Sequence, residues 1–447
     1  GLENLTSVGG SFSIFRNPVL SDLTALGNLT SINGFLNIQE NLSLYNLEGL
    51  GSIEGATIDS MFIMFNDNLS TCEVNSVCEF LANPSGEVWI YSNSYGCDSP
   101  EEIEEACSSC LPEGITFTTQ AQIDSFAINY PTCTEIEGDV FIGAWEPTSN
   151  ISNLNGLNVL TSIGGNLNIE YNDALSSLTG LGNLTSIGGY LNIFGNDSLT
   201  SLTSLESLTY VEGLTIGTND LLTSLEGLEN ITNIQGDIIF GETFTGGWWG
   251  TNLSSLQGLE NIEYIGGTLQ IQNCSSLINL SGLNSLNLLG NLRIVACDSL
   301  ANLTGIENLT FIQGDLTIAG AMFDLSPSLT SLTGLENLMM VGGTITICQN
   351  AALTSITGLD NVTSIGGGIW IYHNFALSGL SGLDNIEAAS ITELHIYNNS
   401  FLSTCEIQSI CDYLVAPSGS IDIHDNAPGC NSQQEIEEAC ASSISEI

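Results

Sequence analysis

The sequence predicts a mainly β, leucine-rich solenoid with short capping helices, present in tandem copies. A unit with the consensus L-x-G-L-x-N-L-T-x-I-x-G-x-L-x-I-x-x-N recurs along the chain, mostly in steps of 23 to 25 residues. In its L-x-I segment two apolar residues flank one that points to the opposite side, which is the alternation of a β-strand. The units show no helical periodicity. Because one unit cannot bury its Leu and Ile residues alone, we expect the units to stack around one long parallel sheet.

Each repeat also carries residues suited to its turns. The paired glycines before the strand permit a tight corner. The Asn after the strand, as at Asn172, Asn196 and Asn219, is expected to bond backbone of the next repeat and to form a stacked ladder. The strands of the complete copy are expected to begin at Leu167, Leu191, Leu214, Ile238, Leu269, Leu292, Leu316, Ile345, Ile369 and Leu394.

A longer period divides the chain into copies. Gly1–Cys110 aligns without a gap on Gly334–Ser443, and roughly half of the aligned residues are identical. We expect residues 1–109 to be the C-terminal part of a first solenoid and residues 110–441 to be a complete second one. Its N-terminal cap is placed at 110–139, its repeats at 140–403 and its Cys-rich cap at 404–441, and residues 442–447 start a linker. Because the chain begins within a copy, further copies are expected in the native protein.

The ends of each copy differ from the repeats and are expected to form caps. Residues 71–81 and 100–107 should form short helices on either side of a strand at Val88–Tyr91, and residues 404–440 repeat that pattern. Residues 118–129 should form a helix before Cys133. That helix would shield the open edge of the first repeat from pairing with other strands.

Most of the 13 cysteines lie in these caps, which predicts disulfides and an oxidising compartment. Four cysteines in a cap allow three connectivities, and we favour the one with a helix-to-helix bridge. A zinc site is the alternative, but the spacing is not that of a zinc knuckle. The favoured pairs are Cys72–Cys97 and Cys78–Cys107 in the first cap, and Cys405–Cys430 and Cys411–Cys440 in the second.

Three further cysteines lie within the repeats. Cys274 and Cys297 each follow the strand Ile by three residues in adjacent repeats, so their side chains should stack. They are expected either to form a disulfide or to remain a ladder of buried thiols. Cys348 is left without a partner, at an outward position.

The start of the complete copy carries a recognisable order of elements. A Cys at 110, a helix at 120–129, a second Cys at 133 and the strand EGDVFI at 137–142 follow one another. In this the chain resembles the receptor L-domain family of insulin- and epidermal-growth-factor-type receptors, and more closely L-domain-like surface proteins of environmental bacteria. The resemblance implies a right-handed solenoid, a Cys110–Cys133 disulfide and a binding or scaffolding role outside the cell. It does not imply hormone binding, because no kinase or furin-like module is present.

The charge of the chain excludes several classes of partner. There are 50 acidic residues against 2 basic ones, and the formal charge is −48. Since phosphate groups and anionic lipids are bound by cations, we expect no nucleic-acid partner and no attraction to anionic membranes. No apolar stretch of roughly 20 residues is present that could insert directly into a membrane.

Cofactors and catalysis are not expected. Acids near strand ends, such as Glu170, Asp173, Asp197 and Asp220, should bind Ca²⁺ at most loosely, because no calcium-loop motif surrounds them. The chain has 3 histidines and no nucleophile elbow or phosphate loop, and no pair of carboxylates stands out. We therefore predict no metal site, no catalytic residue and no enzymatic activity.

Outward residues at the C-terminal end of the sheet are the first candidates for ligand binding. The strand alternation places Trp370, His395 and Asp422 in one column and Tyr372, Tyr397 and His424 in the next. The structural explanation is cross-strand aromatic packing, which stabilises a sheet by about 0.2–1 kcal/mol per pair. The functional explanation is a platform for a ligand or partner, because exposed aromatic surface tends to mark contacts.

Three insertions break the repeat period after a strand and supply the other candidates. They span 143–150, 241–252 and 320–327 and should emerge on one side of the solenoid, where insertions often build a binding site. Such loops would suit a sugar ring, or they would fold their own aromatic side chains onto the sheet. Their aromatic residues are Trp145, Phe244, Trp248, Trp249 and Phe323.

Two functions are consistent with these features. The first is a cell-surface module for adhesion or recognition, with a glycan or a protein on another surface as its partner. The second is structural, with copies joined end to end in a stalk, filament or sheath, so that the partner is the chain itself. Both place the protein outside the cell or at its surface, in a bacterium.

Overall fold

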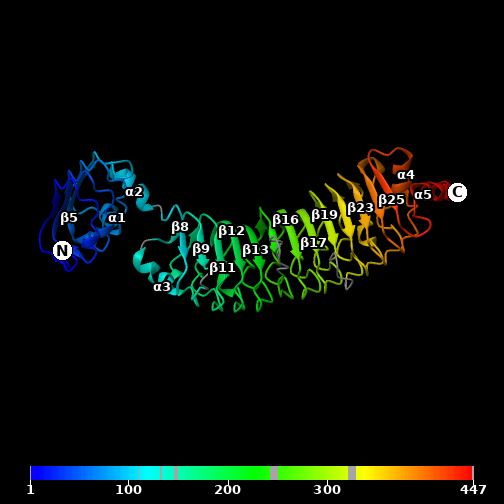
Figure 1. Cartoon of the computed structure of the whole chain (residues 1–447), viewed down its shortest axis with the longest axis horizontal. Helices are drawn as coiled ribbons and strands as arrows, with labels where there is room; N and C mark the ends of the chain where they lie inside the picture. Colours follow the sequence, from blue (N-terminus) through cyan, green and yellow to red (C-terminus); the bar gives the residue numbers. More distant parts are fainter. Residues whose placement is uncertain are drawn as a thin grey trace. The chain divides into compact units, whose positions relative to one another are not determined.

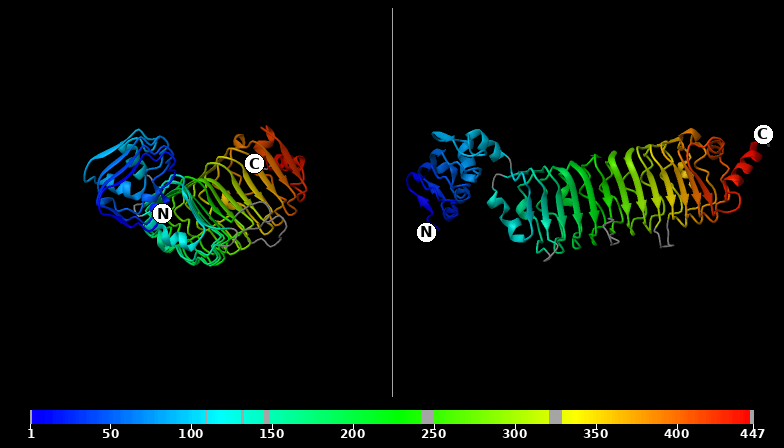
Figure 2. Two further views of the ribbon diagram at one scale, coloured as in Figure 1. Left: turned by 60° about the vertical axis from the view of Figure 1, so that its left-hand side comes forward. Right: turned by 45° about the horizontal axis from the view of Figure 1, so that its top comes forward.

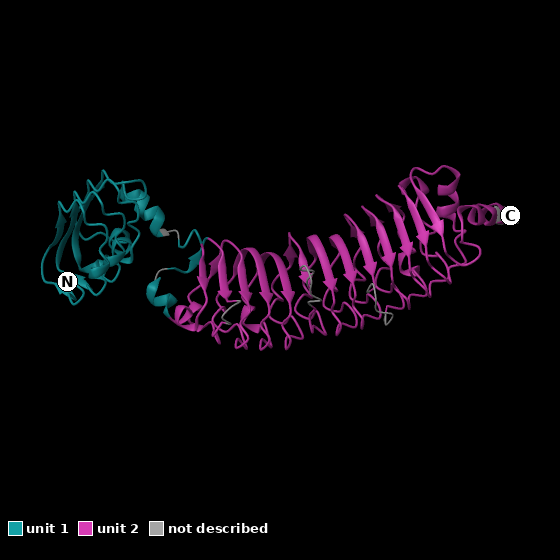
Figure 3. Ribbon diagram, viewed as in Figure 1, with its two compact units in different colours: residues 1–113, 125–137 teal, residues 114–124, 138–447 magenta. Residues whose placement is uncertain are grey.

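The computed structural model describes residues 2–108, 110–130, 133–144, 149–241, 250–320 and 329–444. It contains two compact units (Figure 3). Unit 1 comprises residues 1–113 and 125–137, and unit 2 comprises residues 114–124 and 138–447. Both are mainly β, with parallel strands and few helices. The copy boundaries proposed from the sequence, at residues 109 and 441, stay predictions.

In the described part of the chain the larger sheet has 19 parallel strands, an arrangement compatible with a β-solenoid. Figures 1 and 2 show its strands side by side in chain order along unit 2. The strands that form the main row are β7 (Ile115–Phe117), β9 (Val140–Gly143), β11 (Leu167–Glu170), β12 (Ser186–Phe194), β13 (Tyr210–Gly217), β15 (Ile238–Phe240), β16 (Tyr264–Gln272), β17 (Leu288–Val295), β19 (Leu316–Ala319), β21 (Ile345–Cys348), β23 (Ile369–Tyr372), β24 (Leu394–Tyr397) and β25 (Ile421–His424). The short strands are β8 (Glu135–Ile136), β10 (Ser162–Ile163), β14 (Asn233–Ile234), β18 (Phe311–Ile312), β20 (Met340–Val341) and β22 (Ser364–Ile365).

The strands pair in the register that the repeat predicts. Leu191 of β12 pairs with Leu167 on one side and with Leu214 on the other, one repeat away in each direction. These three side chains are fully buried. Burying a Leu or Ile side chain contributes roughly 1.5–3 kcal/mol, and each repeat buries several, so stacking of the repeats supplies the core.

Unit 1 has the same elements in fewer repeats. Its main sheet has four strands in the order β2 (Phe12–Phe15), β4 (Gly34–Gln39), β5 (Ile58–Met64) and β6 (Val88–Tyr91), and β1 (Ser7–Val8) pairs with β3 (Ser31–Ile32). The helices of the chain are α1 (Asn75–Ala82), α2 (Pro100–Ser108), α3 (Gln120–Asn129), α4 (Gln408–Val415) and α5 (Gln433–Ile444). Short 3-10 turns lie at Thr24–Leu26, Glu48–Leu50, Gly55–Thr57, Asn155–Leu157, Thr203–Leu205, Thr357–Leu359 and Ala388–Ser390.

The cap helices lie close to the predicted positions, with one difference. A helix was expected from residue 71, but α1 begins at Asn75 because Val74 before it is extended, with φ −93° and ψ 151°. Cys72, at the start of the predicted helix, is instead buried in the core and bonded to Cys97. The strand expected at Val88–Tyr91 is β6.

Five disulfides connect the caps in the described part of the chain. They are Cys72–Cys97, Cys78–Cys107, Cys110–Cys133, Cys405–Cys430 and Cys411–Cys440, the pairs favoured from the sequence and from the family resemblance. Each cap helix that carries a cysteine is thereby tied to a second segment, which limits how far the caps open in the unfolded chain.

The bridge considered between Cys274 and Cys297 does not form, and both remain thiols. Each thiol lies against carbonyl oxygens at the end of its strand. The Cys274 sulfur is 3.5 Å from the Gln272 oxygen, and the Cys297 sulfur is 3.5 Å from the Val295 oxygen. The two thiols also form a hydrogen bond with each other. Their mutual hydrogen bond is the first cause, and burial the second, that raise the pKa of Cys297 and keep it protonated.

A ladder of Asn side chains, most of them buried, joins the repeats, but its direction is the reverse of the prediction. The Asn196 amide donates to the carbonyl of Ile169 in the preceding repeat, at 2.8 Å, and its oxygen accepts from the backbone N–H of Asn172, at 3.2 Å. The same amide donates to the oxygen of Asn219, at 3.2 Å. Each Asn therefore bonds backbone of the preceding repeat, not the next. The ladder comprises Asn17, Asn41, Asn66 and Asn93 in unit 1 and Asn172, Asn196, Asn219, Asn350, Asn374, Asn399 and Asn426 in unit 2.

The residue before most ladder positions has a left-handed backbone. Ten of these residues are not glycine, and two further left-handed residues precede Cys274 and Cys297 at the corresponding point of their repeats; the φ values of all twelve lie between 41° and 61°. For an L-residue this conformation costs roughly 1–2 kcal/mol. We attribute its persistence to the hydrogen bonds of the ladder, which fix the next residue. The twelve are Arg16, Glu40, Phe65, Ser92, Tyr171, Thr218, Asn273, Ala296, Gln349, His373, Asn398 and Asp425.

Candidate functional site

The last three strands of unit 2 bring the predicted aromatic residues together. The strand alternation buries Ile371 and Ile396 in the core and leaves their neighbours in the same strands on the outward face. Register pairs join Trp370 to His395 and His395 to Asp422, and join Tyr372 to Tyr397 and Tyr397 to His424. We call this surface the aromatic face, and it comprises Trp370, Tyr372, His395, Tyr397 and His424.

The rings of the aromatic face are stacked nearly parallel. Trp370 and His395 have centroids 4.0 Å apart and an interplanar angle of 17°. Tyr397 lies between Tyr372, at 5.0 Å and 11°, and His424, at 5.2 Å and 8°. The facing sides of neighbouring rings therefore cover each other, and the edges of the rings remain for other molecules. Offset stacking of this kind stabilises a pair by about 0.5–1.5 kcal/mol beyond its buried area.

An acid and a hydroxyl orient the first column. Glu393 accepts a hydrogen bond from the Trp370 indole N–H at 3.1 Å. Its other oxygen is 3.4 Å from His395 Nε2, which also contacts the Ser420 hydroxyl at 3.2 Å. The indole hydrogen bond is the main cause that lowers the pKa of Glu393, so the carboxylate stays ionised. His395 is thus held by the stacking of its ring on Trp370 and by the contacts of its Nε2 atom with Glu393 and Ser420. Its side chain is 13% exposed.

A second acid lies between two histidines. Asp422 has one oxygen 3.9 Å from His395 Nδ1 and the other 3.5 Å from His424 Nε2. His424 Nδ1 is 2.8 Å from Asp425. The third histidine of the chain, His373, also borders this surface, with its ring 6.2 Å from Tyr397.

Sequence reasoning missed Glu393 and Ser420. They form an outward column two residues before the Trp370 column, on the same side of the sheet because strand residues alternate with a period of two. Extending the predicted columns back by one step would have found them.

Cys348 occupies an outward position, as predicted, yet it is buried. It pairs in register with Tyr372 and is only 5% exposed. Burial is the main cause that raises the pKa of both the Cys348 thiol and the Tyr372 phenol, and a hydrogen bond between them raises that of Tyr372 further. Both groups are therefore neutral at physiological pH, which leaves the thiol a poor nucleophile.

The equivalent columns of unit 1 contain a different set of residues. In the first column Phe62 and Trp89 meet at 5.6 Å with an interplanar angle of 90°. Tyr91 of the second column meets Phe65, which lies just after β5 and outside the columns, at 5.4 Å and 87°. Trp89 is 51% exposed and Tyr91 is 41% exposed. Unit 1 thus presents a more open aromatic surface, with rings packed edge to face.

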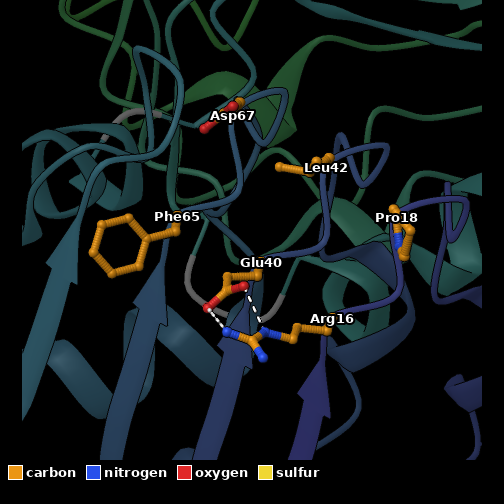
Figure 4. A pocket seen from close by; sticks show the side chains of 6 residues that line it. All are labelled: Arg16, Pro18, Glu40, Leu42, Phe65 and Asp67. Atoms are coloured by element: carbon orange, nitrogen blue, oxygen red, sulfur yellow. Dashed lines mark hydrogen bonds and ion pairs between the residues drawn. The ribbon is translucent and has the colours of Figure 1, made fainter.

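A hollow of about 510 Å³ lies beside the turns of unit 1 (Figure 4). Arg16 reaches across to Glu40 of the next repeat, with Nε 2.7 Å from one carboxylate oxygen and Nη2 3.3 Å from the other. Its guanidinium carbon also lies 4.8 Å above the Phe15 ring. The charge of Arg16 is therefore balanced within the unit, and the hollow offers little attraction to an anion.

The candidate residues of the three insertions lie outside the described residues. They are Trp145, Phe244, Trp248, Trp249 and Phe323. The strands that precede the insertions, β9, β15 and β19, end at Gly143, Phe240 and Ala319. The predicted role of the insertions stays a prediction.

The acids near the strand ends form a column without a metal cluster. Among the described residues no group of three or more His, Cys, Asp or Glu side chains is arranged to hold a metal ion. Burial, followed by repulsion from Asp220 and Asp173, raises the pKa of Asp197. Asp197 therefore lies close enough to Asp173 and Asp220 for their negative charges to repel it. Loose binding of screening cations at these acids stays a prediction.

Comparison with known proteins supports the family resemblance over part of the chain. Residues 161–240, which run from the start of β10 through the end of β15, match the model of the Receptor L domain family. No curated protein is similar to the chain. In the described part of the chain no helix is long and apolar enough to cross a membrane. The family match and the five disulfides indicate an extracellular, receptor-type domain.

Proposed function

We propose that this chain is a non-enzymatic recognition or adhesion module of a bacterial cell-surface protein, and that the aromatic face of unit 2 binds a partner on another surface. The observation that carries the proposal is the set of stacked rings held by Glu393 and Ser420 on an outward face. Nucleic acids and membranes are not proposed as partners, because a charge of −48 opposes both. We propose no cofactor for this role, and Ca²⁺ would bind the surface acids at most loosely.

The geometry of the rings favours a protein over a glycan as the partner. A sugar ring packs its C–H groups on an open aromatic face, but the facing sides of neighbouring rings in each column already cover each other. What remains are ring edges, the Tyr hydroxyls and the carboxylates of Glu393 and Asp422. Those groups suit hydrogen bonds and edge contacts with the side chains and backbone of a protein.

Panning the intact chain against a displayed peptide library, in parallel with a glycan array, tests this proposal. We expect peptide binders whose affinity falls at least about tenfold, or 1.4 kcal/mol, with Tyr397→Ala or His395→Ala. Thr215→Ala, at an outward position in the middle of the same sheet, is the matched control and should leave binding unchanged. Binders that ignore the aromatic substitutions, or glycans as the sole ligands of this face, would contradict it.

We propose a structural role as the second candidate. The observation that favours it is the gapless correspondence between residues 1–110 and residues 334–443, which includes matching disulfides in both caps. Copies of this kind would join end to end in a stalk or filament. Sedimentation and electron microscopy of the chain across a range of concentrations test it. A monomer under all conditions would argue against self-assembly and leave the recognition role intact.

A further inference from the structure

The last strand of unit 1 carries an exposed ring beside an exposed acid. Trp89 in β6 and Glu87 just before it are two residues apart, so they lie on the same outward side of the sheet, with Cα atoms roughly 6.6 Å apart. Trp89 is 51% exposed and meets Phe62 edge to face, so its ring is not stacked on a parallel neighbour. Among the described residues neither the Trp89 indole N–H nor the Glu87 carboxylate makes a hydrogen bond.

The corresponding acid of unit 2 is bound within the chain. The alignment of residues 1–110 with residues 334–443 pairs Ser60 with Glu393. It also pairs Glu87 with Ser420, so the acid and the serine have exchanged strands. Glu393 accepts hydrogen bonds from the Trp370 indole at 3.1 Å and from the Ser420 hydroxyl at 3.2 Å. In unit 1 the Ser60 hydroxyl accepts the backbone N–H of Glu87 at 3.1 Å instead, which leaves the carboxylate to solvent.

The first strand of the same sheet shows which group suits a ring beside a carboxylate. The guanidinium carbon of Arg16 lies 4.8 Å from the centre of the Phe15 ring, and its Nε is 2.7 Å from the carboxylate of Glu40 (Figure 4). A cation in this position is attracted both by the ring face and by the negative charge. The only other basic residue of the chain, Arg293, is partly buried in β17 of unit 2. A cation for Trp89 and Glu87 must therefore come from another molecule.

A second ring with an acid continues this surface. Tyr91, the next outward residue of β6, is 41% exposed and meets Phe65 at 5.4 Å. Phe65 and Asp67 line the hollow of unit 1 (Figure 4). Arg16 in the same hollow is neutralised by Glu40, whereas Asp67 has no ion-pair partner among the described residues. The hollow therefore retains one uncompensated negative charge beside an exposed ring.

The charge of the chain favours a basic partner over a neutral one. With a formal charge of −48, the protein attracts cationic groups at long range and repels a second copy of itself. A neutral sugar would pack on the exposed rings but would leave Glu87 and Asp67 without a counter-charge. A basic side chain uses both the ring and the acid at each place.

We propose that the outward face of β6 in unit 1, together with the adjoining hollow, binds a basic segment of another protein. One Arg or Lys side chain of that segment lies between Trp89 and Glu87, and a second lies between Phe65 and Asp67. The proposal concerns unit 1 and does not rest on the partner of the aromatic face of unit 2.

A pair of matched peptides tests the proposal on the intact chain. One peptide alternates Arg and Gly, and the other has citrulline, which has the shape of Arg without its charge, in place of each Arg. Titration at about 0.5 M salt screens the long-range attraction between the acidic chain and any cation. We expect the indole ¹⁵N–¹H signal of Trp89, assigned with Trp89→Ala, to shift with the Arg peptide alone. The Trp370 signal should stay in place, because His395 covers that ring at 4.0 Å.

Substitutions locate the two contacts. Trp89→Ala should weaken binding of the Arg peptide at least about fivefold. Glu87→Gln and Asp67→Asn should each weaken it about threefold, and both keep the side-chain shape at exposed positions, so they test the site even where Trp89→Ala disturbs the fold. Tyr45→Ala, at a ring that is also 51% exposed, and Glu101→Gln, at an exposed acid of α2, are the controls and should leave the affinity unchanged.

Three results would overturn the proposal. Equal shifts of the Trp89 signal with the citrulline peptide would show that charge plays no part. Unchanged affinity in Glu87→Gln or Asp67→Asn, or an equal loss in Glu101→Gln, would reduce the attraction to the diffuse charge of the chain. A shift of Trp89 with neutral oligosaccharides that the Arg peptide does not reverse would make a glycan the occupant. None of these results bears on peptide binding by the aromatic face, which is measured through Tyr397→Ala and His395→Ala.

Discussion

The outward faces at the ends of the two units lie in the same register and carry different chemistry. At one pair of positions unit 1 has Phe62, which meets its neighbour edge to face at 90°. Unit 2 has His395 there, stacked at 17° on Trp370 and in contact with two acids. The apolar rings of unit 1 are thus replaced in unit 2 by rings whose edges carry polar groups next to the carboxylates of Glu393 and Asp422.

The framework beneath these faces is shared. Asn66 in unit 1 and Asn399 in unit 2 make corresponding sets of ladder hydrogen bonds, and Cys72–Cys97 corresponds to Cys405–Cys430. Because strand residues alternate between core and surface, outward side chains change without disturbing inward ones. The comparison assigns stability to the core and the ladder, and leaves the outward columns free to carry the binding chemistry that we propose for unit 2.

The largest expected effect is loss of a ladder Asn, which should cost the same in both units. Asn66→Ala and Asn399→Ala each leave buried carbonyl and N–H groups without partners, at a cost of about 3 kcal/mol. Hydrogen exchange resolved by unit, combined with denaturant unfolding, measures this. Ser400→Ala, one residue after Asn399 at an exposed position, is the control and should change stability little. If the loss in free energy of unfolding in one unit were more than twice that in the other, the ladder would not stabilise the two units equally.

Relief of backbone strain should have the next largest effect. Thr218 is β-branched and left-handed, with φ 41°, and its buried hydroxyl has no hydrogen-bond partner among the described residues. Thr218→Gly should stabilise unit 2 by about 1 kcal/mol. The reverse change, Gly195→Thr, should destabilise it, because a Cβ there would lie 2.9 Å from the Tyr171 ring. Thermal unfolding of both variants shows whether each substitution raises or lowers the stability of unit 2. Destabilisation by Thr218→Gly would show that the hydroxyl or its methyl group is needed.

The two aromatic faces should contribute modestly and similarly to stability. Double-mutant cycles on Tyr372 and Tyr397 in unit 2 and on Phe62 and Trp89 in unit 1 should each give coupling free energies of about 0.2–1 kcal/mol. Denaturant unfolding of single and double Ala variants supplies the values. A coupling above about 2 kcal/mol in unit 2 would make the stacked rings a structural element and weaken the case for a binding surface.

The smallest effect concerns the acid column and depends on pH. Burial raises the pKa of Asp197 in the folded state, so its charged form destabilises unit 2. This penalty is absent below the pKa of the unfolded chain and complete above the pKa of the folded one. Asp197→Asn should therefore stabilise the protein by a few tenths of a kcal/mol at pH 7, and the gain should vanish as the pH falls below about 3.5. An equal gain at both pH values would rule out charge as its cause.

Much of the fold followed from the repeat, and the reason is the strict alternation of buried and exposed residues. The L-x-I spacing gave the pairing of Leu167 with Leu191 and of Trp370 with His395, because parallel strands of equal repeats align residue by residue. The direction of the Asn ladder did not follow. Spacing shows that the amides stack, but it does not show which of two neighbours each amide faces.

The cysteines of the repeats show the same limit of the periodicity. Cys274 and Cys297 stack as predicted, but the spacing left open whether they form a disulfide or remain thiols, and both remain thiols with hydrogen bonds to nearby carbonyl oxygens. Cys348 points outward yet is buried beside Tyr372, because a large ring in the next repeat covers a small neighbour. The stacking angle of the rings, which decides between edge and face contacts, depends on hydrogen bonds to Glu393 that no periodicity reports.

The interrupted ladder has a mechanical consequence. In the middle of unit 2, Thr251, Cys274 and Cys297 occupy positions where Asn stands elsewhere, and a thiol is a weaker donor than an amide. If unit 2 were pulled from its two ends, the load would pass through every repeat in series. The repeats would part first at these three residues, between a block joined by the Asn172, Asn196 and Asn219 ladder and a block joined by the ladder from Asn350 to Asn426. Under tension, unit 2 should therefore give way first near its middle.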